Sequence, residues 1–98
     1  MILLRRELGD VLRQRRQQQG RTLRDVAASA QVSLGYLSEI ERGEKEASSE
    51  LLASVCGALQ IRLSDTMHQV SQRMAVAESL TAPVPLPVPA PQPARSAA

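Results

Sequence analysis

Few side chains in this sequence have the types and spacing that catalysis or metal binding requires. His68 is the only histidine and Cys56 the only cysteine, so neither a multi-cysteine metal site nor a disulfide framework is available. Cys56 lies in the apolar run LLASVCGAL and is expected to be a small buried hydrophobe. The sequence has no glycine-rich phosphate loop and no metal-ligand spacing. We therefore predict no catalytic residue, no metal and no cofactor, which argues against an enzyme.

Charge offers a second kind of chemistry, because the basic residues are unevenly distributed. The net charge is only +2, yet the first quarter of the chain is rich in arginine and the middle is acidic. The arginines are Arg5, Arg6, Arg13, Arg15, Arg16, Arg21 and Arg24, and the acidic residues are Glu39, Glu41, Glu44, Glu46 and Glu50. A basic end is compatible with a polyanionic partner. A solvated helix face explains the same pattern equally well, so charge alone leaves both interpretations open.

The stretch TLRDVAASAQVSLGYLSEIERG, residues 22–43, is the element that must position the remaining candidates. Thr22 is a good N-cap, and Asp25 can reach back to the freed amide as in a capping box. Ser33 caps a second short helix, and Gly43 ends it. Two helices of about residues 22–29 and 33–42, separated by a tight turn, are typical of a helix-turn-helix.

This stretch resembles the helix-turn-helix of the Cro/C1-type (lambda-repressor-like) DNA-binding family. The resemblance is carried by Thr22, Ala27, Val32, Ser33, Tyr36, Leu37, Ser38, Ile40 and the run Glu41-Arg42-Gly43. The longer run RTLRDVAASAQVSLGYLSEIERG, followed by KEASSELLASVC, resembles the ClgR-type regulators of actinobacteria, which activate Clp protease genes. Two positions depart from the family pattern. Leu23 replaces a common phosphate-binding glutamine, and Gln31 replaces a turn glycine, so Gln31 must adopt a left-handed conformation or a different turn.

The resemblance implies that the second helix enters the major groove and that its outward side chains read base edges. Because Leu37 and Ile40 face inward, the predicted base-reading residues are Ser33, Leu34, Gly35, Tyr36, Ser38 and Glu39. Glu39 can accept a hydrogen bond from cytosine N4, Leu34 can contact a thymine methyl group, and Gly35 permits close approach. The Tyr36 side chain either offers its hydroxyl to DNA or packs on the domain, and the sequence leaves both roles open.

Phosphate contacts must supply most of the affinity, since no Arg or Lys is expected on the base-reading face. The candidates are the cations Arg21, Arg24, Arg42 and Lys45 and the helix N-termini capped by Thr22 and Ser48. For Arg42 the alternative is an internal ion pair with an acidic neighbour such as Glu39 or Glu46.

Three further helices complete the predicted fold. Residues 4–19 form an amphipathic first helix, and Ser48 and Ser64 are the expected N-caps of helices four and five. Helix five runs to about residue 79, further than one compact domain needs. Its apolar positions are therefore predicted to form a dimer interface: Met67, Val70, Met74 and Ala77. The alternative is that helix five folds back on its own core.

The chain changes composition at its C-terminal end, where prolines exclude helix and central strand. We expect residues 80–98 to be a disordered Pro/Ala-rich tail after a domain of residues 1–79. Ala97-Ala98 resembles tags that Clp-type proteases read, although a frayed terminus is the simpler explanation. The start MILLRREL does not form a signal peptide, and no stretch approaches membrane-spanning length, so a cytoplasmic protein is expected.

Together these features predict an all-α, five-helix lambda-repressor-like domain. The predicted function is that of a homodimeric regulator that binds a pseudo-palindromic operator in double-stranded DNA. The resemblance further implies that it activates Clp protease and stress genes. The alternative is a protein-binding module, such as an antitoxin-like partner or a regulator that sequesters another protein.

Overall fold

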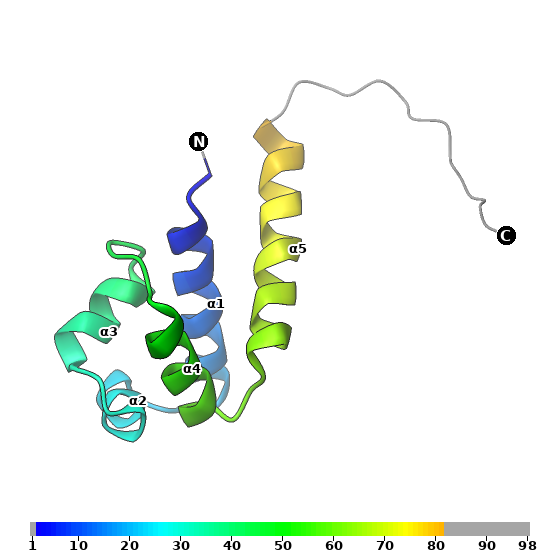
Figure 1. The fold of residues 1–98 in the computed structure, drawn as a ribbon. Coiled ribbons are helices and arrows are strands. Elements are labelled where there is room, and N and C mark those ends of the chain that lie inside the picture. The colour runs from blue at the N-terminus through cyan, green and yellow to red at the C-terminus, as the bar shows by residue number, and fades with distance from the viewer. Residues whose placement is uncertain (1, 82–98) are drawn as a thin grey trace, which may run out of the picture.

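The computed structural model describes residues 2–81, and this part of the chain is all-helical, as predicted. Five helices follow one another: α1 (Leu4–Gln18), α2 (Leu23–Ala30), α3 (Leu34–Glu41), α4 (Ser49–Ala58) and α5 (Leu63–Thr81). Figure 1 shows α2 and α3 on one side of α1, α4 in front of α1, and the long α5 beside α1 on the other side. The proline-rich segment and Ala97-Ala98 lie outside the described residues.

Hydroxyl side chains start three of the helices, as the sequence predicts. Thr22, Ser33 and Ser48 each accept a hydrogen bond from the backbone N–H three residues later, at 3.0 Å in every case. Two details of the predicted caps are wrong. Asp25 does not complete a capping box, because its carboxylate accepts a hydrogen bond from Arg21 Nε at 2.8 Å. Ser64 is not a cap, because α5 already begins at Leu63.

Helices α1 to α4 all end in the same backbone motif. Two successive N–H groups bond back into the last turn, and the first of them belongs to a left-handed residue. These residues are Gly20, Gln31, Gly43 and Gln60, with φ angles of 66°, 60°, 73° and 58°. Gln31 therefore adopts the left-handed conformation that its position in the turn requires, which was one of the two possibilities left open. The same conformation at Gln60 was not predicted.

The hydrophobic core draws on all five helices. It consists of Leu8, Val11, Leu12, Val26, Ala27, Ala30, Leu37, Ile40, Leu51, Val55, Cys56, Leu59 and Val70. Leu37 and Ile40 are 0% and 1% exposed, so the predicted inward face of α3 is confirmed. With that face buried, the orientation of the opposite face of α3 is determined as well.

Helices α1 and α3 approach each other closely at Gly9. A Cβ atom at Gly9 would lie 2.8 Å from the backbone carbonyl oxygen of Glu41, so only glycine fits there. About two turns further along α1, Arg16 and Glu41 form a double hydrogen bond at 2.8 and 3.0 Å. The Arg16 and Glu41 side chains are only 14% and 8% exposed. This buried pair satisfies both charges and fixes the position of α3 on α1.

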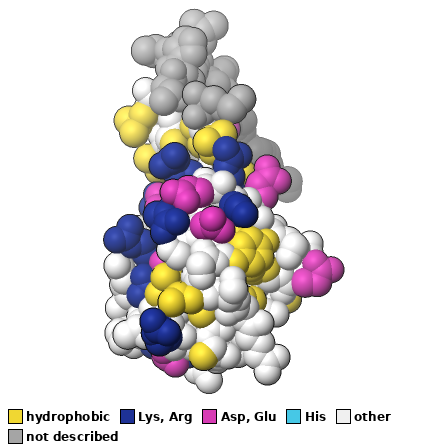
Figure 2. Space-filling model, turned by 90° about the vertical axis from the view of Figure 1, so that its left-hand side faces the viewer, with side chains coloured by type: hydrophobic (Ala, Val, Ile, Leu, Met, Phe, Trp, Pro, Cys, Tyr) yellow, Lys and Arg dark blue, Asp and Glu magenta, His cyan; other side chains and the backbone are white. Residues whose placement is uncertain are grey.

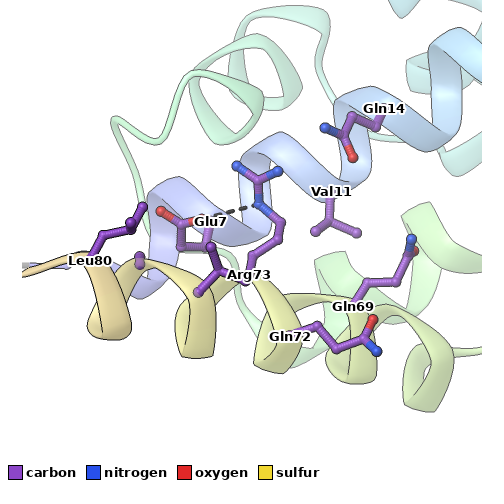
Figure 3. A pocket seen from close by; sticks show the side chains of 9 residues that line it. Glu7, Val11, Gln14, Gln69, Gln72, Arg73 and Leu80 are labelled. Carbon is purple, nitrogen blue, oxygen red and sulfur yellow. Dashed lines mark hydrogen bonds and ion pairs between the residues drawn. The ribbon is translucent and has the colours of Figure 1, made fainter. Parts of the chain in front are cut away.

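Helix α5 is held against α1 by polar contacts that were not predicted. Arg73 reaches from α5 to two acids of α1, Glu7 Oε1 at 3.0 Å and Asp10 Oδ2 at 2.7 Å. Figure 3 shows the first of these contacts in the groove between the two helices. Arg15 Nε on α1 donates to Gln69 Oε1 on α5 at 2.7 Å.

The residues predicted to form a dimer interface occupy different environments on α5. Val70 is only 2% exposed in the single chain, and Met74 packs against the same core, so α5 does fold back on its own domain at these positions. Met67 is 37% exposed, whereas Ala77 is partly buried. The end of α5 leaves further apolar surface exposed at Val76 and Leu80.

Candidate nucleic-acid interface

Helix α3 buries one face and presents the other to solvent. Gly35 is exposed and Ser38 and Glu39 are half-buried on the outer side of α3, whereas Leu34 is partly buried and packs against the hydrophobic core. A Cβ atom at Gly35 would have no heavy atom within 4 Å, so the backbone there is open to close approach. The structure thus places Gly35, Ser38 and Glu39 on the accessible side of α3, while Leu34, like Tyr36, also packs on the domain.

Tyr36 and Ser33 have structural roles beside any contact with DNA. Tyr36 is partly buried and packs against the hydrophobic core, and its hydroxyl donates to the backbone carbonyl of Glu46 at 3.5 Å. Ser33 is exposed, but its hydroxyl caps α3. Of the two roles left open for Tyr36, the packing role is present in the structure.

Two cations reach the outer face of α3 from its C-terminal end. The Arg42 guanidinium donates to both carboxylate oxygens of Glu44, at 3.1 and 3.0 Å, and also to the Ser38 hydroxyl. Lys45 Nζ lies 3.6 Å from Glu39 Oε1. Arg42 lies one turn after Ser38 on the same side of the helix, and the left-handed turn at Gly43 brings Glu44 and Lys45 back beside α3. No Arg or Lys occupies a predicted base-reading position itself, so these cations remain the candidates for phosphate contacts. The alternative ion pair of Arg42 is present, with Glu44 as the partner.

The pair of Arg42 and Glu44 lies in solvent and remains charged. The hydrogen bond from Arg42 lowers the pKa of the Glu44 carboxyl, and the same bond raises the pKa of Arg42. The two side chains are 53% and 55% exposed. Exposed ion pairs contribute little net stability, so Arg42 can exchange Glu44 for another anion at small cost.

The other predicted phosphate ligands differ in accessibility. Arg21 turns inward and donates to Asp25 and to the backbone carbonyl of Ala58, which ties α2 to α4. Arg24 is exposed, and its side chain makes no hydrogen bond or ion pair with another described residue. Thr22 and Ser48 are exposed at the ends of their helices, with their hydroxyls used as caps.

A small polar pocket between α1 and α3 contains a candidate that the sequence did not reveal. The pocket measures about 240 Å³ and is lined by Arg13, Arg16, Ser38, Glu41 and Arg42. The Arg13 side chain is exposed and makes no hydrogen bond or ion pair within residues 2–81. The only sequence signal is the spacing of Arg13 and Arg16, which places both on one helix face. The sequence does not show which element that face meets.

Charges of both signs are mixed over this surface. Figure 2 views the molecule from the left-hand side of Figure 1 and shows Lys and Arg side chains interleaved with Asp and Glu side chains. Ion pairs such as Arg42–Glu44, Lys45–Glu39 and Arg5–Glu46 contribute to this pattern. A polyanion that binds here must therefore compete with carboxylates of the protein itself.

The described residues provide little for other kinds of chemistry. Residues 2–81 contain no group of three or more His, Cys, Asp or Glu side chains that could hold a metal ion. Cys56 is buried, as predicted, with its Sγ 3.5 Å from Thr66 Oγ1. The groove between α1 and α5 has a volume of about 480 Å³ and is lined by mixed side chains that include Gln14, Gln72 and Leu80 (Figure 3). No helix in the described part of the chain is both long and apolar enough to cross a membrane.

Comparison with known proteins agrees with this geometry. A family model described as "Helix-turn-helix" matches residues 12–65. The transcriptional regulator ClgR of Mycobacterium tuberculosis is 58% identical over 83 residues, which cover 85% of this chain and 74% of that protein. The chain belongs to the Cro/C1-type helix-turn-helix family. The relatives matched in Mycobacterium tuberculosis and Deinococcus deserti are transcriptional regulators, and the protein is likewise a DNA-binding transcriptional regulator and not an enzyme.

Solved structures of Cro/C1-type proteins share the fold. The crystal structure of the clp gene regulator ClgR from Corynebacterium glutamicum superposes with a TM-score of 0.77 at 49% identity, covering 81% of this chain and 84% of that one. A restriction-modification controller protein, crystallised as a tetramer with its natural 35 base-pair operator, superposes with a TM-score of 0.71. That protein is only 19% identical, and the match covers 76% of this chain and 99% of that one, so it shows a shared fold.

Proposed function

We propose that this regulator binds a pseudo-palindromic operator as a homodimer and activates Clp protease and stress genes. The observation that best supports operator binding is the outer side of α3, where the backbone at Gly35 is open and cations lie at the C-terminal end of the helix. The link to Clp genes is supported by the 58% and 49% identity to proteins called ClgR, one of them described as a clp gene regulator.

In the proposed complex, α3 lies in the major groove. Ser33, Leu34, Gly35, Tyr36, Ser38 and Glu39 face the base edges, where Glu39 accepts from cytosine and Leu34 meets a thymine methyl group. Arg24, Arg42 and Lys45 hold phosphates, together with the backbone amides at the helix N-termini that follow Thr22 and Ser48. We leave Arg21 out of this set, because its guanidinium is occupied by Asp25 and Ala58.

The proposed dimer uses α5 and the apolar side chains beside it. Met67 and Met74 on α5 lie next to Leu4 on α1, and the three line one shallow groove. Leu4, Leu63 and Met67 are exposed large hydrophobic residues. A second copy of the chain would remove this surface from water. Burial would stabilise the dimer by roughly 25 cal/mol for each Å² of apolar area. Val70 is excluded, since it already lies in the core of one chain.

The decisive experiment compares one substitution at two helical glycines. Gly35 and Gly57 both have open space where a Cβ would be, so Gly35→Glu and Gly57→Glu should both fold. A carboxylate at Gly35 would face the DNA. Gly35→Glu should therefore weaken binding to promoter fragments of Clp protease genes by roughly a hundredfold or more, because like charges held together cost several kcal/mol. Gly57→Glu should bind as the unmodified protein does.

The measurement is a fluorescence-anisotropy titration with each promoter fragment and with random DNA of equal length. The unmodified protein is expected to bind the promoter fragment roughly a thousandfold or more tighter than the random DNA. If the unmodified protein shows no preference for the promoter over random DNA, Clp protease genes are not its target. If both glutamate variants bind equally well, α3 is not the reading helix. Recognition of Ala97-Ala98 by a Clp protease falls outside the described residues and stays a prediction from the sequence.

A further inference from the structure

We propose that the pocket between α1 and α3 is a binding site for one backbone phosphate of the bound DNA, held by Arg13 and Arg42. This inference rests on the proposed function, because it places α3 in the major groove. It adds a ligand from α1, Arg13, that neither the sequence pattern nor the family resemblance assigns.

The electrostatics of the pocket favour an anion. Arg13, Arg16 and Arg42 line it together with a single carboxylate, that of Glu41. Glu41 is already neutralised by the double hydrogen bond with Arg16, and Arg16 uses its remaining terminal nitrogen to donate to the Arg21 carbonyl at 3.0 Å. The positive charges of Arg13 and Arg42 therefore remain available, and that of Arg42 is offset mainly by the exposed Glu44, with a weaker interaction with Glu39.

The position of the pocket matches the path of a DNA strand. The major groove is roughly 12 Å wide, and an α-helix with its side chains is roughly 10–12 Å across. A helix in the groove therefore has a phosphate backbone along each flank. Ser38 belongs both to the outer face of α3 and to the wall of the pocket. The pocket thus opens where the reading face ends and α1 begins, which is where a flanking phosphate must pass.

The size of the pocket favours a phosphate group over a larger ligand. Its volume of about 240 Å³ lies below the roughly 300–1,000 Å³ of pockets that enclose drug-sized ligands. The Ser38 hydroxyl and two guanidinium groups provide hydrogen-bond donors for the phosphate oxygens, and arginine is well suited to bind phosphate through two parallel hydrogen bonds. A bound phosphate would replace Glu44 as the partner of Arg42.

The test measures binding to a random 30-base-pair duplex, since phosphate contacts do not depend on sequence. Arg13→Gln should weaken this binding roughly tenfold and reduce the slope of log K against log salt concentration by about 0.9. Arg62→Gln is the matched control, because it removes the same charge from an 84% exposed side chain at the start of α5. The control should change neither quantity. The variant with both Arg13→Gln and Arg42→Gln should lose less than the product of the single losses, because both arginines hold one phosphate.

Each alternative result has a distinct meaning. If the unmodified protein binds the duplex and Arg13→Gln behaves like Arg62→Gln, this inference is wrong while the proposed function stands. If the unmodified protein does not bind duplex DNA, the proposed function itself fails. A third arm measures thermal unfolding with inorganic phosphate. If millimolar phosphate stabilises the unmodified protein but not Arg13→Gln, and both bind DNA equally, the pocket is a small-anion site and the inference is overturned.

Discussion

At the scale of single residues, the mixed charge of the α3 surface is the main feature. Arg42 and Lys45 are the cations nearest to the base-reading residues, and each is paired with a carboxylate of the same surface. A phosphate must compete with Glu44 for Arg42. In the proposed complex these carboxylates would weaken the electrostatic attraction to DNA, and so limit binding that depends on phosphates alone.

This competition leads to a prediction for Glu44. Glu44→Gln should free Arg42 and tighten binding to random duplex DNA several-fold, and the salt slope should steepen by about 0.9. Asp65→Asn is the control, because Asp65 pairs with Arg62 in a similarly exposed ion pair on α5. Anisotropy titrations at several salt concentrations give both quantities. Weaker binding by Glu44→Gln would instead mean that Glu44 orients Arg42 for DNA.

The pH dependence of this effect follows from the direction of the pKa shift. Arg42 lowers the pKa of Glu44, so the carboxylate is ionised at all pH values well above its ordinary value of about 4.3. The competition of the Glu44 carboxylate for Arg42 is therefore present above that value, and it is lost only as the pH falls through the lowered pKa. The difference between Glu44→Gln and the unmodified protein should therefore be constant between about pH 6 and about pH 8. A marked change within that range would indicate that another group controls the competition.

At the scale of helices, the contact between α1 and α3 determines where the reading face points. Gly9 permits the close approach of the two backbones, and the buried pair of Arg16 and Glu41 fixes it. The pocket with Arg13 forms beside the same contact. Any change that separates α1 from α3 should therefore disturb both the proposed reading face and the proposed phosphate site.

Two glycine substitutions should have opposite effects on stability. Gly9→Ala would place a Cβ 2.8 Å from the Glu41 carbonyl oxygen, and should destabilise the fold by about 1–3 kcal/mol. Gly57→Ala in α4 meets no atom within 4 Å and should stabilise it by about 0.5–1 kcal/mol, because alanine favours helix over glycine. Thermal unfolding followed by circular dichroism should show shifts of opposite sign, at about 4–8 °C per kcal/mol. A neutral Gly9→Ala would show that α3 can shift on α1 without loss.

At the scale of the whole molecule, α5 has two roles: it packs against the core of its own chain, and it carries the surface of the proposed dimer interface. Its inner side belongs to the core through Thr66 and Val70, and Arg73 ties it to α1. Its other side and its end leave Met67, Val76 and Leu80 exposed. The same helix therefore packs in the fold of one chain and leaves apolar surface exposed for the proposed second copy.

The proposed dimer is tested by a charge on the exposed side of α5. Met67→Lys should halve the mass measured by light scattering at micromolar concentration, because it would bury an unpaired charge at the interface. His68→Lys is the control on the same helix, since His68 lies outside the groove of Leu4, Met67 and Met74. An unchanged mass for Met67→Lys would remove this face from the interface. Met67 is preferred to Met74 for the test, because Met74 packs against the core of its own chain.

Much of this protein could be predicted from the sequence because its signals are local. The caps at Thr22, Ser33 and Ser48, the inward pair Leu37 and Ile40, and the five-helix order depend on residues within a few turns of one another. The Cro/C1-type resemblance rests on one continuous stretch in the same way, and the comparisons confirm it.

The remaining features were decided only by the tertiary structure, because they join residues that are distant in sequence or separated by a reversal of the chain. The sequence shows that Arg42 has acidic neighbours, but the turn at Gly43 selects Glu44 as its partner. The packing of α1 on α3 distinguishes Gly9 from Gly57 and brings Arg13 into one pocket with Ser38 and Arg42. The packing of α5 on α1 divides a uniform apolar pattern into a buried Val70 and an exposed Met67. Local patterns therefore determined the helices, while contacts between helices determined which side chains remain free to bind.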